Sequence, residues 1–108
     1  MARSSDVFEL KPGSFSLPPA HPGLTLADEL AARGMTAHAL ALKLQVPANR
    51  ISAIVAGTRG ISAETALRLG RYFDTGAAFW MNLQSHYDLA VAEKELGDRI
   101  ALEVEKAA

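Results

Sequence analysis

The polar side chains best suited to chemistry lie in one short stretch, the run Pro-Ala-Asn-Arg-Ile-Ser-Ala at residues 47–53. Asn49, Arg50 and Ser52 supply hydrogen-bond donors and acceptors near the start of an expected helix, and Ala48 and Ala53 keep the same face slim. A helix that lies in the major groove of DNA needs such a face. The pattern is compatible with a surface that contacts duplex DNA and equally with a solvated face of an all-helical domain.

Two short helices are expected to position this stretch. Thr36 can cap the first with its hydroxyl, and Pro47 is predicted to be the first residue of the second, where its fixed φ suits a helix start. Gly57 is placed to end the second helix. The apolar residues of both helices recur at helical spacing and mark their buried faces: Leu40, Ala41, Leu44, Ile51, Ile54 and Val55. A pair of this kind is typical of a helix-turn-helix.

Helices are also expected on either side of this pair. Thr25 and Asp28 have the spacing of a capping box, which predicts the start of a first helix that Gly34 ends. Ser62 can cap a fourth helix, with Glu64 in its first turn. The predicted inner faces of these two helices contain Leu26, Leu30, Ala66, Leu69, Gly70 and Phe73.

Residues 77–108 are helical in composition after a break at residues 74–76. We expect Gly97 to interrupt this segment and Asp98 to cap a last helix, which would pack against a second copy of the chain. Aromatic and leucine side chains at helical spacing predict a core cluster of Phe79, Trp80, Leu83 and Tyr87.

The 108 residues predict three parts: a flexible tail at 1–20, a helix-turn-helix DNA-binding domain at 21–76 and a helical extension at 77–108 that forms a dimer. The N-terminus lacks the order of a signal peptide, so we expect a cytoplasmic protein that is associated with the nucleoid when it binds DNA. Because 49% of the residues are hydrophobic, a small core can form.

Charge is distributed unevenly along the chain, although the net charge is only −1. Between Arg33 and Phe73 there are six basic residues and one acid, Glu64, whereas residues 74–108 contain seven acids and three bases. Phosphate binding depends on local positive charge, so the middle of the chain is suited to nucleic acid. The acidic C-terminal part could face a basic partner, or it could be a solvated helix face.

No set of residues predicts catalysis. His21, His38 and His86 are scattered, cysteine is absent, and no glycine-rich phosphate loop or paired histidine motif occurs. We therefore predict that the chain is not an enzyme and has no metal site and no cofactor.

Several motifs together resemble one family, the HigA-type antitoxins of the XRE helix-turn-helix regulators. They are the HPG sequence at 21–23, VPANRIS at 46–52, GTRGIS at 57–62, ALRLGRYF at 66–73 and FWMNLQSHYDL at 79–89. The resemblance implies an all-α, lambda-repressor-like domain of about five helices with a C-terminal helical extension. It also implies a homodimer, an inverted-repeat operator in double-stranded DNA and a toxin partner of the RelE or HigB type, which cleaves mRNA and is neutralised by the antitoxin.

The resemblance also implies a set of DNA-binding residues. Matching positions open the helix that crosses the phosphate backbone, form the recognition helix and lie in the loop that follows it: Thr36, Ala37, His38, Ala48, Asn49, Arg50, Ser52, Ala53, Thr58 and Arg59. Two positions depart from the family pattern. Gln45 replaces the usual glycine of the turn, where a positive φ would strain a glutamine, and Leu24 replaces a glutamate.

Three functions remain open from the sequence. The chain is a dimeric repressor that also binds a toxin, a stand-alone regulator without a toxin, or a toxin-neutralising protein whose DNA-binding face is vestigial. Salt-dependent, sequence-specific DNA binding would separate the first two from the third, and a co-purifying small basic protein would separate the first from the second.

Overall fold

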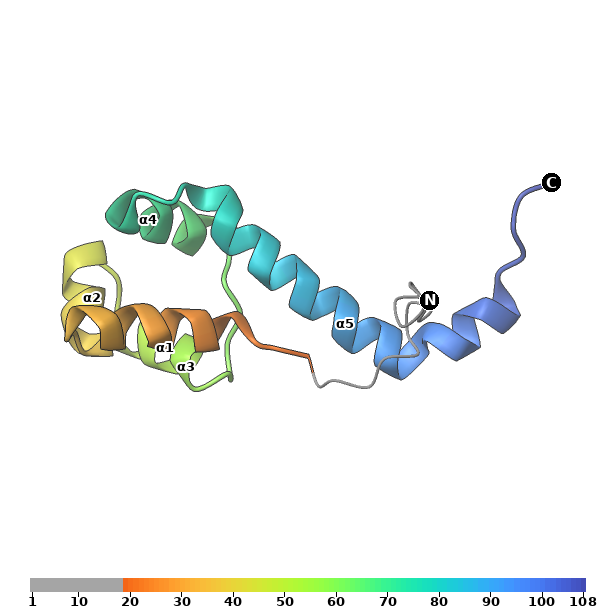
Figure 1. Cartoon of the computed structure of the whole chain (residues 1–108), viewed down its shortest axis with the longest axis horizontal. Coiled ribbons are helices and arrows are strands. Elements are labelled where there is room, and N and C mark those ends of the chain that lie inside the picture. Colours follow the sequence, from red (N-terminus) through yellow and green to blue (C-terminus); the bar gives the residue numbers. More distant parts are fainter. Residues whose placement is uncertain (1–18) are drawn as a thin grey trace, which may run out of the picture. The chain divides into compact units, whose positions relative to one another are not determined.

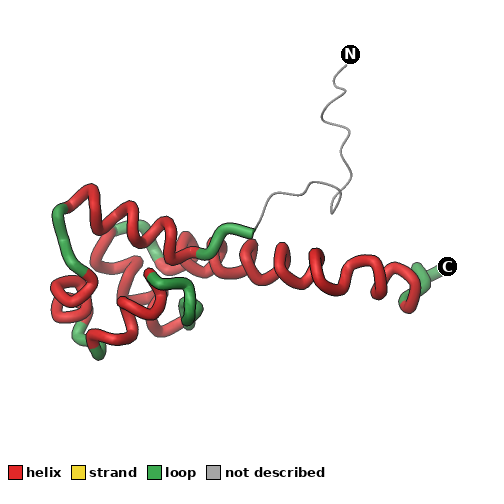
Figure 2. The backbone as a smooth tube through the Cα atoms, turned by 90° about the horizontal axis from the view of Figure 1, so that it is seen from below, coloured by secondary structure: helices red, strands yellow, loops and turns green. Residues whose placement is uncertain are grey.

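The computed structural model describes residues 19–108, so the predicted tail at 1–20 lies almost entirely outside the described residues. In the described part, α-helices account for all regular secondary structure, with no strand (Figure 2). The five helices are, in chain order, α1 (Pro22–Arg33), α2 (Ala37–Leu44), α3 (Ala48–Val55), α4 (Ala63–Phe73) and α5 (Ala77–Glu103) (Figure 1). The predicted all-α class with five helices is confirmed.

The described residues belong to two compact units. Residues Ala20–Asp88 form one unit, which contains α1 to α4 and the first part of α5, and Leu89–Ala108 belong to the other. The first part of α5 is therefore within the same unit as the helix-turn-helix, whereas the predicted domain boundary lay at residue 76.

The start of α1 differs from the prediction. His21 is its N-cap, and the ring atom Nδ1 accepts a hydrogen bond of 2.9 Å from the Gly23 N–H. Pro22 is the first helical residue, a position where the missing N–H of proline costs nothing. The predicted capping box of Thr25 and Asp28 is wrong, because both residues already lie inside the helix.

The other helix boundaries follow local signals closely. The Thr36 hydroxyl accepts from the Ala39 N–H at 3.0 Å, and the Ser62 hydroxyl accepts from the Thr65 N–H at 3.3 Å, so both predicted caps are confirmed. Gly34 ends α1 in the left-handed region. Pro47 is the N-cap of α3 rather than its first helical residue, because its ψ of 143° is extended.

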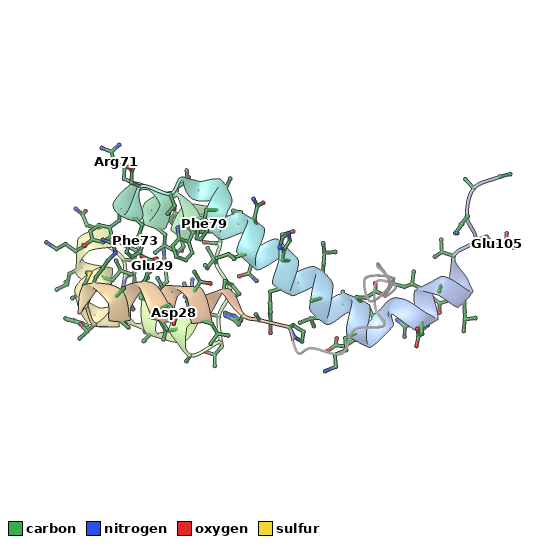
Figure 3. The ribbon with its side chains drawn as sticks, in the orientation of Figure 1. Asp28, Glu29, Arg71, Phe73, Phe79 and Glu105 are labelled. Atoms are coloured by element: carbon green, nitrogen blue, oxygen red, sulfur yellow. The ribbon has the colours of Figure 1, made fainter. Side chains whose placement is uncertain are left out.

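One hydrophobic core holds the 20–88 unit together. Every helix of the unit contributes to it: Leu26, Leu30, Leu40, Ala41, Leu44, Ile51, Ile54, Ile61, Ala66, Leu69, Phe73 and Trp80 are buried. Trp80 is fully buried and satisfies its ring N–H by donating to the Thr75 hydroxyl at 2.9 Å. Phe73 extends from α4 toward α1 (Figure 3), where the Arg33 guanidinium carbon is 4.9 Å from its ring centroid.

The predicted aromatic cluster is only partly a core. Trp80 is buried and Leu83 packs against the core, but Phe79 is 42% exposed. The ring of Tyr87, which is half-buried, instead contacts the ring of His21, with centroids 4.8 Å apart.

Helix α5 continues through Gly97, so the predicted interruption there and the cap at Asp98 are wrong. A glycine inside a helix costs about 1 kcal/mol relative to alanine, which good helix formers on both sides can offset. In the 89–108 unit this helix exposes Leu89, Ile100 and Leu102. Among the described residues, no helix is long and apolar enough to cross a membrane.

Candidate nucleic-acid interface

The turn between α2 and α3 is built on a left-handed residue. Gln45 has φ 60° and ψ 48°, the conformation that glycine usually supplies after a helix. It allows the Gln45 N–H to donate to the Leu42 carbonyl at 3.2 Å and the Val46 N–H to the Ala41 carbonyl at 3.1 Å. Gln45, which stands where the family usually has glycine, therefore does adopt a positive φ.

Helix α3 separates two faces. Ile51 and Ile54 are completely buried, whereas Ala48, Asn49 and Ser52 are exposed. The Ser52 hydroxyl lies 3.3 Å from the Asn49 carbonyl and 3.4 Å from the Ala48 carbonyl of the preceding turn. Ala53 is half-buried at the margin of the exposed face. The structure thus brings together four of the five predicted recognition residues on one slim, accessible surface.

Arg50 is the exception among the predicted recognition residues. Its side chain is only 19% exposed, and Nη1 lies 3.4 Å from Oε1 of Glu64 on α4. Its Nε is buried and has no hydrogen-bond partner in the described part of the chain. In this structure Arg50 therefore lies against α4 and not beside Asn49 and Ser52. The sequence offers one signal of this, since Glu64 is the only acid between residues 33 and 73.

The predicted DNA-binding residues at the start of α2 are only partly exposed. Thr36 and His38 are exposed, although the Thr36 hydroxyl is already used by the cap. Ala37 packs against the core. The remaining N–H groups of the first turn and the exposed imidazole are groups of the kind that bind phosphate oxygens.

The loop from Gly57 to Gly60 follows α3. Gly57 has φ 81°, and the Thr58 N–H and hydroxyl both bond to the Ala53 carbonyl, at 3.0 and 3.2 Å. The Thr58 side chain therefore helps to end α3. Arg59 is exposed at the tip of this loop.

A residue far along the chain holds this loop in place. The Gln84 Oε1 of α5 accepts from the Ile61 N–H at 2.7 Å, and its Nε2 donates to Asp88 Oδ1 at 2.9 Å. Gly60 allows the close approach, because a Cβ there would lie 3.0 Å from the Gln84 amide. Sequence reasoning missed Gln84, and a single glutamine on a helix gives no signal from which its role could be found.

Additional positive charge lies beside the turn. A shallow depression of about 390 Å³ is lined by residues of α2, the turn and α4: Lys43, Leu44, Gln45, Leu67, Arg68, Arg71 and Tyr72. Arg71 points from α4 away from α1 (Figure 3). Within residues 19–108 no group of three or more histidine, aspartate or glutamate side chains is arranged to hold a metal ion.

Two amphipathic helices joined by a left-handed turn, with an accessible polar face on the second, define a helix-turn-helix protein. Comparison with family models agrees, since the helix-turn-helix model matches residues 26–80. The chain belongs to this family. Its relatives are regulators and antitoxins rather than a class of enzymes.

Individual relatives confirm the predicted resemblance to HigA-type antitoxins. An addiction module antidote protein of the HigA family from Coxiella burnetii is 46% identical, with a TM-score of 0.82 over 84% of this chain and 100% of that one. The antitoxin HigA of Pseudomonas aeruginosa, solved with the higBA promoter, is 50% identical, with a TM-score of 0.81 over 83% and 99%. Virulence-associated protein I of Dichelobacter nodosus is 49% identical over 77% of this chain and 78% of its own.

Proposed function

We propose that this chain is a transcriptional repressor and antitoxin that binds its operator through α3. The observation that carries the proposal is the division of α3 into a fully buried aliphatic face and an exposed face of Ala48, Asn49 and Ser52. The similar Pseudomonas aeruginosa antitoxin was solved with promoter DNA, which supports the same use of the fold here.

Two kinds of contact would hold the protein on DNA: contacts to base edges and contacts to phosphates. Asn49 can form two hydrogen bonds with adenine, Ser52 can donate to or accept from a base edge, and the methyl groups of Ala48 and Ala53 can pack on thymine. Exposed groups at the start of α2 and in the loop at residues 57–60 would bind phosphates and fix the register of the protein on the duplex.

A homodimer would place two such helices on an inverted-repeat operator. The part of α5 in the 89–108 unit exposes leucine and isoleucine side chains, and burying them against a partner would stabilise the protein. Leu89, Leu96 and Ile100 recur at intervals that place them on one face, so a second copy of the helix is a suitable partner. The two half-sites would then lie about 34–36 Å apart, one helical turn, or a multiple of that.

The antitoxin role rests on the resemblance to HigA proteins. The partner would be a RelE- or HigB-like toxin that cleaves mRNA, and a basic toxin would complement the seven acids of residues 74–108. Co-expression with the small basic protein of a neighbouring reading frame tests this role. Co-purification and rescue of growth would support it, whereas operator binding without any such partner would indicate a stand-alone regulator.

DNA binding can be tested directly. Fluorescence anisotropy would compare a duplex from the chain's own promoter with a scrambled duplex of the same length, over a range of salt concentrations. We expect strong salt dependence and tighter binding to the promoter. Asn49→Ala should relax base preference and cost about 1–3 kcal/mol at the adenine that it contacts. Equal, weak affinity for both duplexes would contradict the proposal and favour a toxin-binding protein with a vestigial DNA face.

A further inference from the structure

A chain of charged side chains links the three helices that surround the turn. Glu64 on α4 contacts Arg50 of α3 through Oε1 at 3.4 Å and Arg68 of α4 through Oε2 at 3.1 Å. Arg68 in turn donates from Nη1 to the Leu44 carbonyl, the last residue of α2, at 2.9 Å. The carboxylate of Glu64 therefore joins α3 to α4, and Arg68 joins both to the end of α2.

We propose that Glu64 is a positioning residue for sequence recognition: it holds Arg50 against α4 and so sets both the pose of α3 and the charge that α3 presents to DNA. The inference rests on the proposed function and deepens it. It assigns a role in specificity to a residue that contacts no base.

The electrostatics of the site support this role. Glu64 is the only acid between residues 33 and 73, on a surface whose other charges favour phosphate. A carboxylate here weakens the attraction to every duplex alike, because phosphate binding carries no sequence information. The same carboxylate keeps the guanidinium of Arg50, whose side chain is 19% exposed, away from phosphate contacts with DNA of any sequence. Glu64 thus lowers the affinity for DNA of any sequence and raises the preference for the operator over other sequences.

The burial of Arg50 explains why the restraint depends on Glu64. The buried Nε has no hydrogen-bond partner in the described part of the chain, so the contact with Glu64 is the polar interaction that fixes this guanidinium. Without the carboxylate, a buried and incompletely satisfied donor gains by moving toward solvent or phosphate. The side chain would then swing out, and the start of α3 would lose its link to α4.

Two substitutions separate the position of Glu64 from its charge. Glu64→Gln and Glu64→Ala both remove the negative charge, but only glutamine retains one oxygen in place of Oε1 that can accept from Arg50, whereas its amide NH2 group cannot accept from Arg68. The measurement is the ratio of affinities for the promoter duplex and a scrambled duplex. This ratio is insensitive to a loss of folded protein, because an unfolded fraction lowers both apparent affinities equally.

We expect the affinity for scrambled DNA to rise about twofold in both variants, since one repulsive charge is lost in each. The specificity ratio should fall about tenfold in Glu64→Ala and about threefold in Glu64→Gln, in the range of couplings between neighbouring charged residues. In Glu64→Ala the affinity for scrambled DNA should also depend more steeply on salt. If the freed Arg50 makes one added phosphate contact, the slope of log affinity against log salt concentration should steepen by about 0.9.

Glu29→Ala is the matched control. Glu29 lies on α1 (Figure 3). It forms a comparable ion pair with Arg33 at 3.3 Å, and its side chain is 40% exposed. This variant removes the same charge and a similar pair elsewhere, so its specificity ratio should equal that of the unmodified chain.

Three results would overturn the inference while leaving the proposed function intact: an unchanged ratio in Glu64→Ala, the same ratio in the alanine and glutamine variants, or an equal fall in Glu29→Ala. A ratio near one in the unmodified chain would instead reject the proposed function. Circular dichroism of each variant would check that the helices are retained.

Discussion

Replacing Gln45 by glycine should stabilise the protein. Gln45 occupies the left-handed region with φ 60° and is exposed at the turn between α2 and α3. This conformation costs a residue with a Cβ roughly 1–2 kcal/mol. Glycine removes that strain but loses about 0.5–1 kcal/mol through the greater freedom of the unfolded chain. The net expectation is a gain of about 0.5–1 kcal/mol in the free energy of unfolding.

Urea denaturation followed by circular dichroism measures this gain. The midpoint should rise while the m-value stays constant, since the substitution changes little of the surface that unfolding exposes. The melting temperature should rise by about 3–6 °C for a domain of this size. Protein concentration must be the same in all samples, because the apparent stability of the proposed dimer would depend on it.

A substitution series at the same position identifies the cause. Asparagine tolerates the left-handed region better than glutamine, and alanine tolerates it no better, so stability should decrease in the order glycine, asparagine, and then alanine together with glutamine. Gln45→Ala is the matched control, because it removes the side chain but retains the Cβ. If alanine stabilises the protein as much as glycine does, the gain does not come from backbone strain and the reasoning is refuted.

Three further predictions concern the scaffold. Thr36→Ala removes the α2 cap and should cost about 1 kcal/mol of unfolding free energy, measured by urea denaturation, whereas no change would show that water replaces the hydroxyl. Gly70→Ala should lower the free energy of unfolding by more than about 3 kcal/mol, because the added Cβ would meet the backbone carbonyl carbon of Gly76. Near-normal stability of this variant would contradict such close packing of α4 against the turn at Gly76. Gln84→Ala leaves the part-buried Ile61 N–H without its acceptor and should lower the free energy of unfolding by about 1–3 kcal/mol. Hydrogen exchange of the Ile61 amide should become faster. Unchanged exchange would show that the loop does not depend on α5.

Much of the fold follows from the sequence because its signals are local. A hydroxyl at a helix start finds its N–H three residues later, so Thr36 and Ser62 could be identified as caps from sequence alone. Apolar residues at helical spacing must share a face, so the burial of Ile51 and Ile54 could be predicted in the same way.

Local signals mislead where two of them compete. Thr25 and Asp28 have capping-box spacing, but His21 and Pro22 begin α1 earlier. Gly97 marks a weak point of a helix without being a stop, since the cost of one glycine is less than the gain from a continuous helix. Both errors concern where an element begins or ends, and neither concerns the fold.

The sequence by itself determined the class of the protein, the two faces of α3 and the positive charge around them. Only the tertiary structure decided which polar side chains those faces present. It placed Arg50 on Glu64, fourteen residues away, and Gln84 on the Ile61 N–H, twenty-three residues away. Such pairings depend on how the helices pack, because a single hydrogen bond between distant residues leaves no periodic trace along the chain.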